Sequence, residues 1–138
     1  MSIVGVGTDL VAIHRIAAAM ERHGERFARR VLADAEVEQW LHRGKTAAFL
    51  AKRFAAKEAL SKALGCGIGA QVGFHDIHIS SDGSGAPALI LSGAGLEHAR
   101  SKGVVACHLS LSDERDYALA YVVLEGRVAN TSVPDQDT

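Results

Sequence analysis

The sequence has few aromatic residues, only two cysteines and almost no net charge. Aromatics make up 5% of its 138 residues. Cys66 and Cys107 lie far apart and form no CxxC pair, so neither a disulfide framework nor a zinc site is expected. The formal net charge of -1 argues against a protein that binds nucleic acid by neutralising phosphates.

Long apolar runs are missing as well. No run approaches the roughly 18 apolar residues of a membrane span, and the opening residues MSIVGVGTDL lack the basic stretch and apolar core of a signal peptide. We therefore expect a protein without a membrane partner, in the reducing setting of the cytoplasm. With 48% hydrophobic and 22% charged residues, the chain has the composition of a globular domain, and its abundant alanine predicts closely packed helices.

Helical patterns dominate the first half of the chain and strand patterns the second, which indicates an α+β fold. Residues 3–7 are typical of a strand. The apolar spacing that starts at Leu10 predicts a helix ending at Gly24, with Thr8 or Asp9 as its N-cap. Further helices are expected over residues 25–32, from residue 34, and over 45–64 and 93–102, and further strands over 74–81, 88–91, 104–112 and 117–125.

Nothing in the sequence divides the chain into two domains. It has no internal repeat and no stretch with the composition of a linker. We expect a single domain over residues 1–125, followed by a polar tail over residues 126–138 that carries a proline and is disordered.

The helix expected over residues 45–64 carries charged side chains on two sides. On a helical wheel, Arg53 and Lys57 fall within the arc of apolar residues, where a buried cation needs an anion or a route to water. Glu58 and Lys62 lie on the neighbouring side beside small alanines, which leave room for a ligand or for another backbone to approach. Each pair also has an ordinary explanation. Glu58 and Lys62 fit a surface ion pair at i,i+4 spacing. Arg53 and Lys57 fit two cations whose side chains extend along the helix to water.

Asp9 stands between an expected strand and an expected helix. An aspartate in that place is usually an N-cap, but a carboxylate there is also well placed to bind a hard cation. Magnesium often takes one or two protein carboxylates and completes its octahedron with water and substrate phosphates. Asp9 and Glu58, with the cations of the 45–64 helix nearby, would form such a site.

Three other features each allow two interpretations. The glycine-rich stretch 65–69 follows a helix, unlike a P-loop or a dinucleotide fingerprint, so it is either a helix stop or a place where a ligand approaches the backbone. His108, Ser110 and Ser112 share one face of a strand, which is either solvated or the wall of a cleft. The arginine-rich stretch 15–30 is either a solvated helical face or a docking surface for an acidic protein.

Several of these segments together resemble the holo-[acyl-carrier-protein] synthases. Gly5-Val-Gly-Thr-Asp-Leu-Val11 and Arg53-Phe-Ala-Ala-Lys-Glu-Ala-Leu-Ser-Lys62 are similar to the two signature motifs of that family. The likeness covers roughly residues 3–125, and so ordered a set of motifs is highly specific. It continues through residues 65–69, Gly85-Ala-Pro87 and His108-Leu-Ser-Leu-Ser112.

The resemblance implies a fold, an assembly and a reaction. The fold is a compact α+β domain of the 4′-phosphopantetheinyl transferase type, with helices packed on a mainly antiparallel sheet. Three copies are expected to form a homotrimer with active sites in clefts between adjacent subunits. The reaction is the magnesium-dependent transfer of 4′-phosphopantetheine from coenzyme A to a serine of an apo acyl carrier protein, which leaves 3′,5′-ADP. A divalent-metal phosphohydrolase and a non-catalytic nucleotide-binding trimer are the alternatives.

The resemblance also implies roles for particular residues. Asp9 and Glu58 are expected to bind magnesium and, with Lys62, to be the catalytic residues. The base that takes the serine proton is either Glu58, directly or through a metal-bound water, or Asp9. Arg15, Arg22 and Arg26 are expected to dock the acidic carrier protein. The residues expected to bind coenzyme A are Arg53, Lys62, Gly65, Gly67, Gly85, Pro87, His108 and Ser110.

Overall fold

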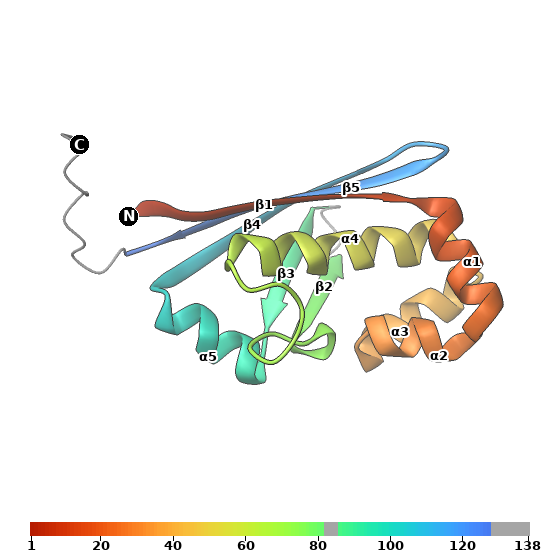
Figure 1. The fold of residues 1–138 in the computed structure, drawn as a ribbon, viewed down its shortest axis with the longest axis horizontal. Helices are drawn as coiled ribbons and strands as arrows, with labels where there is room; N and C mark the ends of the chain where they lie inside the picture. Colours follow the sequence, from red (N-terminus) through yellow and green to blue (C-terminus); the bar gives the residue numbers. More distant parts are fainter. Residues whose placement is uncertain (82–85, 128–138) are drawn as a thin grey trace.

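A long helix, α4 (Ala47–Ala63), lies across one face of a three-stranded antiparallel sheet (Figure 1). The strands have the order β1-β5-β4, so the first strand of the chain forms one edge and pairs with the last. The structure is a computed structural model and describes residues 1–81 and 86–127. The elements of the large sheet are β1 (Ser2–Ala12), β4 (Val104–Asp113) and β5 (Tyr117–Gly126).

The other elements lie on the same side of the sheet as α4 (Figure 1). Three short helices follow β1 and pack around one end of α4, and a two-stranded sheet and a fifth helix pack near its other parts. The expected α+β fold, with helices on a mainly antiparallel sheet, is confirmed. These elements are α1 (Ile13–His23), α2 (Glu25–Val31), α3 (Asp34–His42), the 3-10 turn η1 (Phe74–Asp76), β2 (Ile77–Ser81), β3 (Pro87–Leu91) and α5 (Gly93–Ser101).

The first strand is longer than its sequence pattern predicts. β1 runs to Ala12 and α1 begins at Ile13, so the expected helix start at Leu10 and the expected N-cap roles of Thr8 and Asp9 are wrong. The physical reason is the pairing with β5, in which Asp9 lies opposite Ala120 and every residue from Gly5 to Ala12 has a partner. Such a continuous ladder outweighs the local helical pattern.

Smaller differences concern the ends of elements. Helix α4 begins after Thr46, whose side chain accepts a hydrogen bond from Phe49 N at 3.2 Å, a typical N-cap contact. Residues 74–76 form a 3-10 turn where a strand was predicted. Gly126 still pairs in β5, one residue past the expected end of the domain. Residues 82–85, between two of the expected strands, and the part of the expected tail from residue 128 lie outside the described residues.

Two glycines allow β1 to lie directly against α4. A Cβ atom added to Gly7 would lie 2.0 Å from the carbonyl oxygen of Ala59, and one added to Gly5 would lie 2.1 Å from that of Ala63. The helix also presents small side chains, because Ala59 and its neighbours facing the sheet are alanines that are fully or almost fully buried. The abundance of alanine thus corresponds to close packing, as predicted. No helix in the described part of the chain is long and apolar enough to cross a lipid bilayer.

Gly7→Ala should lower the free energy of unfolding by about 1–3 kcal/mol, because the added methyl group would push β1 away from α4. The matched control is Gly69→Ala. No atom lies within 4 Å of a Cβ added at Gly69, so that variant should stay within about 0.5 kcal/mol of the unsubstituted protein. Urea unfolding curves measure both changes, and equal effects of the two substitutions would argue against the close-approach explanation.

Candidate active site

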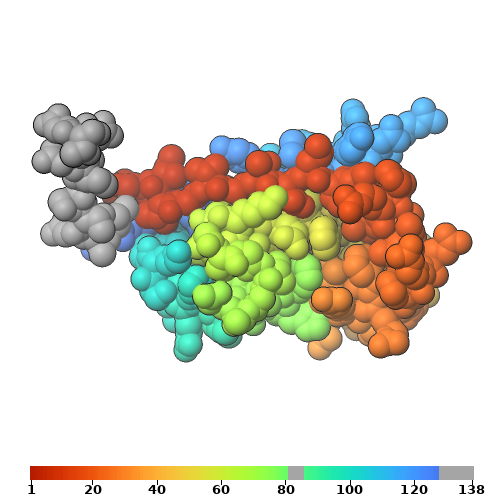
Figure 2. Space-filling model, viewed as in Figure 1, coloured from red at the N-terminus to blue at the C-terminus, as the bar shows by residue number. Residues whose placement is uncertain are grey.

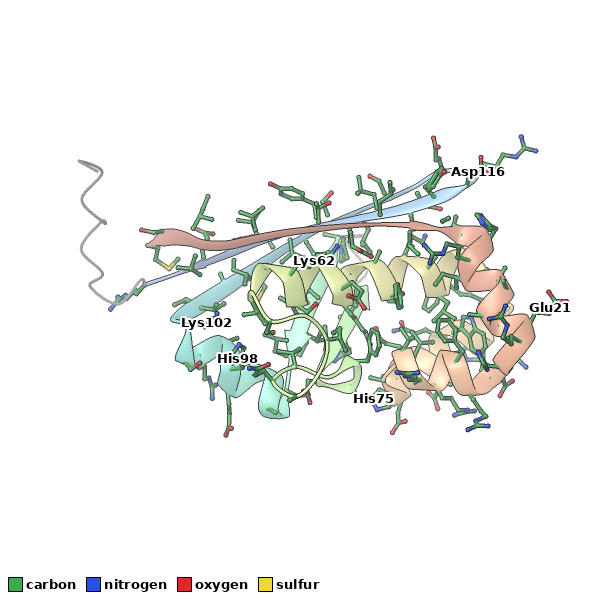
Figure 3. The ribbon with its side chains drawn as sticks, in the orientation of Figure 1. Glu21, Lys62, His75, His98, Lys102 and Asp116 are labelled. Atoms are coloured by element: carbon green, nitrogen blue, oxygen red, sulfur yellow. The ribbon has the colours of Figure 1, made fainter. Side chains whose placement is uncertain are left out.

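Three of the predicted site residues meet where β1 crosses the second half of α4. Lys62 Nζ donates to Asp9 Oδ1 at 2.8 Å and to the carbonyl oxygen of Thr8 at 3.1 Å. Glu58 lies one turn before Lys62 on the same helix and interacts electrostatically with Asp9. Figure 3 shows Lys62 between the helix and the strand. The expected cluster of Asp9, Glu58 and Lys62 therefore exists within one chain.

The position of Asp9 follows from the alternation of side chains along β1. Gly5 and Gly7 face α4, so Asp9 faces it too, whereas Leu10 points to the opposite side of the sheet. The Asp9 side chain is 15% exposed and that of Lys62 is 52% exposed. The cluster is therefore partly shielded and still open to a ligand. In the space-filling view, the surface of α4 lies directly beneath the band formed by β1 (Figure 2).

Glu58 has the electrostatic surroundings of a functional carboxylate. Burial raises its pKa above the ordinary value, and the nearby negative charge of Asp9 raises it further, while Lys62 opposes the shift. A carboxyl group with a raised pKa is a better proton acceptor than an ordinary one. The repulsion between the two carboxylates also means that a cation placed near both would be stabilised.

The donor set of this cluster suits magnesium. Asp9 and Glu58 offer hard carboxylate oxygens, and Lys62 already places a positive charge 2.8 Å from Asp9. Within residues 1–81 and 86–127 no group of three or more His, Cys, Asp and Glu side chains is arranged to hold a metal ion. A pair of carboxylates is too few for a structural zinc or calcium site, but it is a usual protein contribution to magnesium bound with substrate phosphates.

Lys57 has a structural role that the sequence did not reveal. It is completely buried, and its ammonium group donates to Glu36 Oε1 at 2.6 Å, to Val31 O at 2.7 Å and to Phe74 O at 3.1 Å. All three protons of the ammonium group are thereby used. Glu36 is also completely buried and accepts hydrogen bonds from Ala33 N and from the backbone of β2. Lys57 therefore ties α2, α3 and the 3-10 turn η1 to α4, and it does not face a ligand.

Arg53 lies beside this buried pair but also reaches a cavity. Its Nε atom is 3.7 Å from Glu36 Oε2, and its guanidinium lies 4.4 Å from the centre of the Phe49 ring. The cavity, of about 190 Å³, is also lined by Pro87. The structure thus brings together two of the predicted coenzyme A contacts, Arg53 and Pro87, in one wall. Gly85 lies outside the described residues.

Arg53 and Lys62 do not belong to one site within a single chain. Nine residues separate them on α4, which corresponds to about 180° around the helix axis. His108 and Ser110 are farther removed, because they are exposed on the face of the sheet that points away from α4. There His108 is paired with Glu125. The predicted residues therefore form two groups on opposite sides of α4 and a third group on the open face of the sheet.

The backbone at the end of α4 is engaged in closing the helix. Gly65 N donates to Lys62 O, and Gly67 N donates to Ser61 O. These amides are used within the chain, so they do not support the prediction that this backbone holds phosphates through its N–H groups. Both glycines have positive φ angles, 77° and 69°, which explains the residue type.

One cation near this helix end was missed by the sequence analysis. The ammonium group of Lys102, at the end of α5, lies 3.5 Å from the position of a Cβ at Gly65. It is well placed to offset the partial negative charge of the C-terminal end of α4. Nothing in the local sequence signals this contact, because 37 residues separate Lys102 from Gly65.

The arginines predicted to dock a carrier protein are all exposed on α1 and α2. Arg15 and Arg22 lie on α1, and Arg26 lies on α2. Arg26 also lines a hollow of about 350 Å³, together with a histidine, an aromatic side chain and a second arginine. These three are His23, Phe27 and Arg30.

Comparisons with known proteins identify the family to which the chain belongs. The sequence profile of the 4′-phosphopantetheinyl transferase superfamily matches residues 5–122. The chain belongs to that superfamily. It is 56% identical to a holo-[acyl-carrier-protein] synthase from Vibrio cholerae, over 91% of this chain and 99% of that one. The family resemblance and the enzyme class predicted from the sequence are therefore confirmed.

Solved structures share the fold. A crystal structure of a holo-[acyl-carrier-protein] synthase from Neisseria meningitidis superposes with a TM-score of 0.85 and 41% identity, covering 89% of this chain and 98% of that one. A holo-(acyl-carrier-protein) synthase from Bacillus anthracis in complex with CoA (3′,5′-ADP) superposes with a TM-score of 0.74 and 37% identity, covering 92% and 100%. The fold of this chain is therefore that of the phosphopantetheinyl transferases.

Lys57→Met should destabilise the protein by about 3–5 kcal/mol, because it leaves the completely buried carboxylate of Glu36 without its main partner. The double variant Lys57→Met with Glu36→Leu should lose less, since the uncompensated charge is then gone. Chemical denaturation of both variants provides the test. A double variant at least as unstable as the single one would show that the pair contributes packing rather than charge compensation.

Proposed function

We propose that this protein transfers 4′-phosphopantetheine from coenzyme A to a serine of an acyl carrier protein at a site that two copies of the chain share. The supporting observation is the cluster of Asp9, Glu58 and Lys62, which is partly shielded and which combines two carboxylates with a cation. The relatives that carry the same reaction in their names cover nearly the whole chain. Magnesium is the metal we assign to Asp9 and Glu58.

The reaction is the attack of the serine hydroxyl on the β-phosphate of coenzyme A. A new oxygen–phosphorus bond forms, the pyrophosphate bond breaks, and 3′,5′-ADP leaves with the electron pair of that bond. Such a transfer asks the protein mainly for positioning and for charge stabilisation. Magnesium, when bound, supplies neutralisation of the pyrophosphate charge. Glu58 is the residue we assign as the base for the serine proton, because its raised pKa and its half-shielded position suit that role.

Lys62 has two tasks in this proposal. Before substrate binds, its ammonium group compensates Asp9 at 2.8 Å. With coenzyme A in place, its pyrophosphate would lie beside the two carboxylates. The ammonium group of Lys62 is then near enough to turn from Asp9 to the pyrophosphate as charge grows on the leaving group. The partial exposure of the side chain, 52%, gives it the freedom to do so.

A site shared between copies explains why the predicted contacts are separated in one chain. Arg53 and Pro87 face a cavity on one side of α4, and the carboxylate cluster lies on the other side. One coenzyme A molecule would have to pass around the helix to reach both in one copy. If copies are arranged in a ring, the cavity of one copy faces the carboxylate cluster of the next, and each cleft is complete.

The open face of the large sheet is the surface we assign to this assembly. It carries large apolar side chains that a single copy leaves in water, among them Leu10 and Ile3, which are 62% and 64% exposed. No described element lies on that face (Figure 1). Apolar surface of this kind is typical of contacts between subunits. The other exposed apolar side chains that we assign to this surface are Val6 on β1 and Tyr117, Leu119 and Tyr121 on β5.

The basic surface of α1 and α2 suits the carrier protein. Arg15, Arg22 and Arg26 are exposed, and the hollow beside Arg26 is lined by an aromatic ring as well as cations. Acyl carrier proteins are acidic, so charge attraction would orient them and the hollow would receive an apolar side chain. A cytoplasmic location is consistent with the two cysteines, which are both free thiols.

Intact-mass spectrometry of an apo acyl carrier protein, incubated with this protein, coenzyme A and magnesium, should show the gain of one phosphopantetheine group. Glu58→Gln should slow this transfer about 100-fold or more, because it removes both the base and a metal ligand. Release of inorganic phosphate without any change in the carrier mass would instead identify a phosphohydrolase.

The stability of Glu58→Gln separates a catalytic defect from a folding defect. Since the folded protein raises the pKa of Glu58, ionised Glu58 subtracts from stability at neutral pH; this cost shrinks as the pH falls below the raised pKa and is gone below the ordinary value of 4.5. The variant should therefore unfold at the same temperature or a slightly higher one at pH 7. Glu97→Gln, at an exposed position on α5, is the matched control and should leave both transfer and stability unchanged.

Mixing two inactive variants tests the shared site. Glu58→Gln damages the carboxylate cluster, and Pro87→Glu places a carboxylate in the cavity beside Arg53. If adjacent copies supply the two halves, random trimers of the two variants should regain about a quarter of the full activity, because a quarter of the clefts combine two intact halves.

The control for this experiment is a mixture of Glu58→Gln with Asp9→Asn. Both substitutions damage the same half, so no combination of copies restores a cleft, and activity should stay at the level of the separate variants. Failure of Glu58→Gln and Pro87→Glu to rescue each other in verified mixed trimers would mean that each copy holds a complete site.

A further inference from the structure

Glu36, on α3, is a completely buried carboxylate with close neighbours at both of its oxygens. Its Oε1 atom accepts hydrogen bonds from Ala33 N at 2.9 Å and from Lys57 Nζ at 2.6 Å. Its Oε2 atom accepts one from Ile79 N at 3.0 Å and lies 3.7 Å from Nε of Arg53. A carboxylate withdrawn from water needs such partners, and these contacts together fix the position of the group.

The two oxygens of Glu36 serve different parts of the molecule. Oε1 joins Lys57 to the N-cap residue of α3, which is an internal contact, because the side chains of Glu36 and Lys57 are both fully buried. Oε2 faces Arg53, which lines the cavity of about 190 Å³ that Pro87 also lines. The carboxylate is therefore the link between the buried ion pair and a residue that we assign to coenzyme A.

The guanidinium of Arg53 is in contact with an aromatic ring as well as with Glu36. It lies 4.4 Å from the centre of the Phe49 ring, and the Arg53 side chain is only 6% exposed. Burial lowers the pKa of Arg53, and the charge of Glu36 opposes that effect. Because water screens such a buried pair little, the attraction restricts the side chain. Ordering a free arginine side chain costs about 2 kcal/mol, and Glu36 offsets part of this cost before a ligand binds.

We propose that Glu36 is a positioning residue for coenzyme A, which holds the guanidinium of Arg53 in the orientation in which it meets the ligand. The proposal rests on the proposed function and adds to it a residue that touches no ligand. Glu36 acts on Arg53 through charge, since 3.7 Å is longer than a hydrogen bond. Such preorganisation raises the affinity for a ligand without any additional contact to it.

Lys57 keeps Glu36 from neutralising Arg53. Its ammonium group lies 2.6 Å from Oε1 and compensates the carboxylate, whereas Arg53 is 3.7 Å from Oε2. Two cations share one carboxylate, so the three side chains retain a net positive charge. Lys57 is fully buried, and Arg53 is the cation of the three that lines the cavity. The arrangement thus orients Arg53 and leaves it attractive to an anionic ligand.

A double-mutant cycle tests whether Glu36 acts through Arg53. The first variant is Glu36→Gln with Lys57→Met, which removes one charge of each sign and leaves the net charge unchanged. It also keeps an amide oxygen that can accept the hydrogen bond from Ile79 N. Calorimetric titration with coenzyme A should show binding weakened about tenfold, the result expected if about a tenth of the molecules then hold Arg53 in place.

Arg53→Met is the second arm of the cycle. Alone it should weaken the binding of coenzyme A about tenfold or more. Adding Glu36→Gln and Lys57→Met to it should weaken binding by no more than about a further twofold, because the side chain that Glu36 positions is already gone. Effects that multiply, or a first variant that binds like the unsubstituted protein, would overturn the proposal. Glu38→Gln, at an exposed position on α3, is the matched control and should leave binding unchanged.

A purely structural role of Glu36 would give a different result. Destabilisation lowers the number of binding sites per chain in the titration, whereas loss of positioning raises the dissociation constant of each site. A change in site number alone would therefore overturn the proposal even if transfer to a carrier is observed. In the transfer assay, Glu36→Gln with Lys57→Met should raise the KM for coenzyme A and leave that for the carrier within about twofold. Absence of transfer with the expected cycle would overturn the proposed reaction alone.

A measurement on the unsubstituted protein keeps the proposal testable if the variants fail to fold. The NMR signal of the Arg53 Nε–H group, assigned by its loss in Arg53→Met or by contacts to Phe49, reports the motion of this side chain without a ligand. Its order parameter should approach the value of about 0.85 that is typical of rigid backbone, while that of the exposed Arg15 should lie below about 0.6. An Arg53 signal as mobile as that of Arg15 would overturn the positioning role.

Discussion

β1 approaches α4 so closely that a methyl group at Gly7 would overlap the carbonyl oxygen of Ala59. This contact determines the position of Asp9, two residues farther along the strand and on the same face. With any larger residue at the crossing, the strand would move outward and Asp9 would lose its contact with Lys62 at 2.8 Å. A steric requirement in the backbone thus places a carboxylate against a helix that already carries a second carboxylate and a cation, and the chemistry of the site follows from that placement.

The cations of α4 serve different purposes although they lie close together in the sequence. Lys57 is completely buried and joins the short helices to the core through Glu36 and two carbonyl oxygens. Arg53, one turn earlier on α4, has its Nε atom 3.7 Å from the Glu36 carboxylate, and its guanidinium lines a cavity. Lys62, at the other end, is half exposed and compensates Asp9. Burial and the distance to a carboxylate, rather than residue type, separate the structural cation from the two that we assign to the substrate.

The sequence allowed the α+β class, most helices and the cluster of Asp9, Glu58 and Lys62 to be predicted, because periodicity and two ordered motifs carry that information. It did not reveal the full length of β1, since Leu10 fits a helical pattern and only its long-range pairing with β5 places it in a strand. The role of Lys57 was also out of reach, because its partner Glu36 is 21 residues away and nothing local marks the contact. The separation of Arg53 from Lys62 could have been found, since nine helical residues correspond to about half a turn around the axis.

The placement of the two half-sites on opposite sides of one helix has a genetic consequence. In a closed ring of three copies, each copy would contribute its carboxylates to one cleft and its basic cavity to the next. A gene copy that encodes a well-folded chain with both halves damaged would then inactivate at least two of the three clefts in every ring that contains its product. Such an allele would be dominant over a normal one, whereas an allele whose product fails to fold would merely reduce the number of rings. The most harmful substitutions in this protein would therefore be those that leave its fold intact.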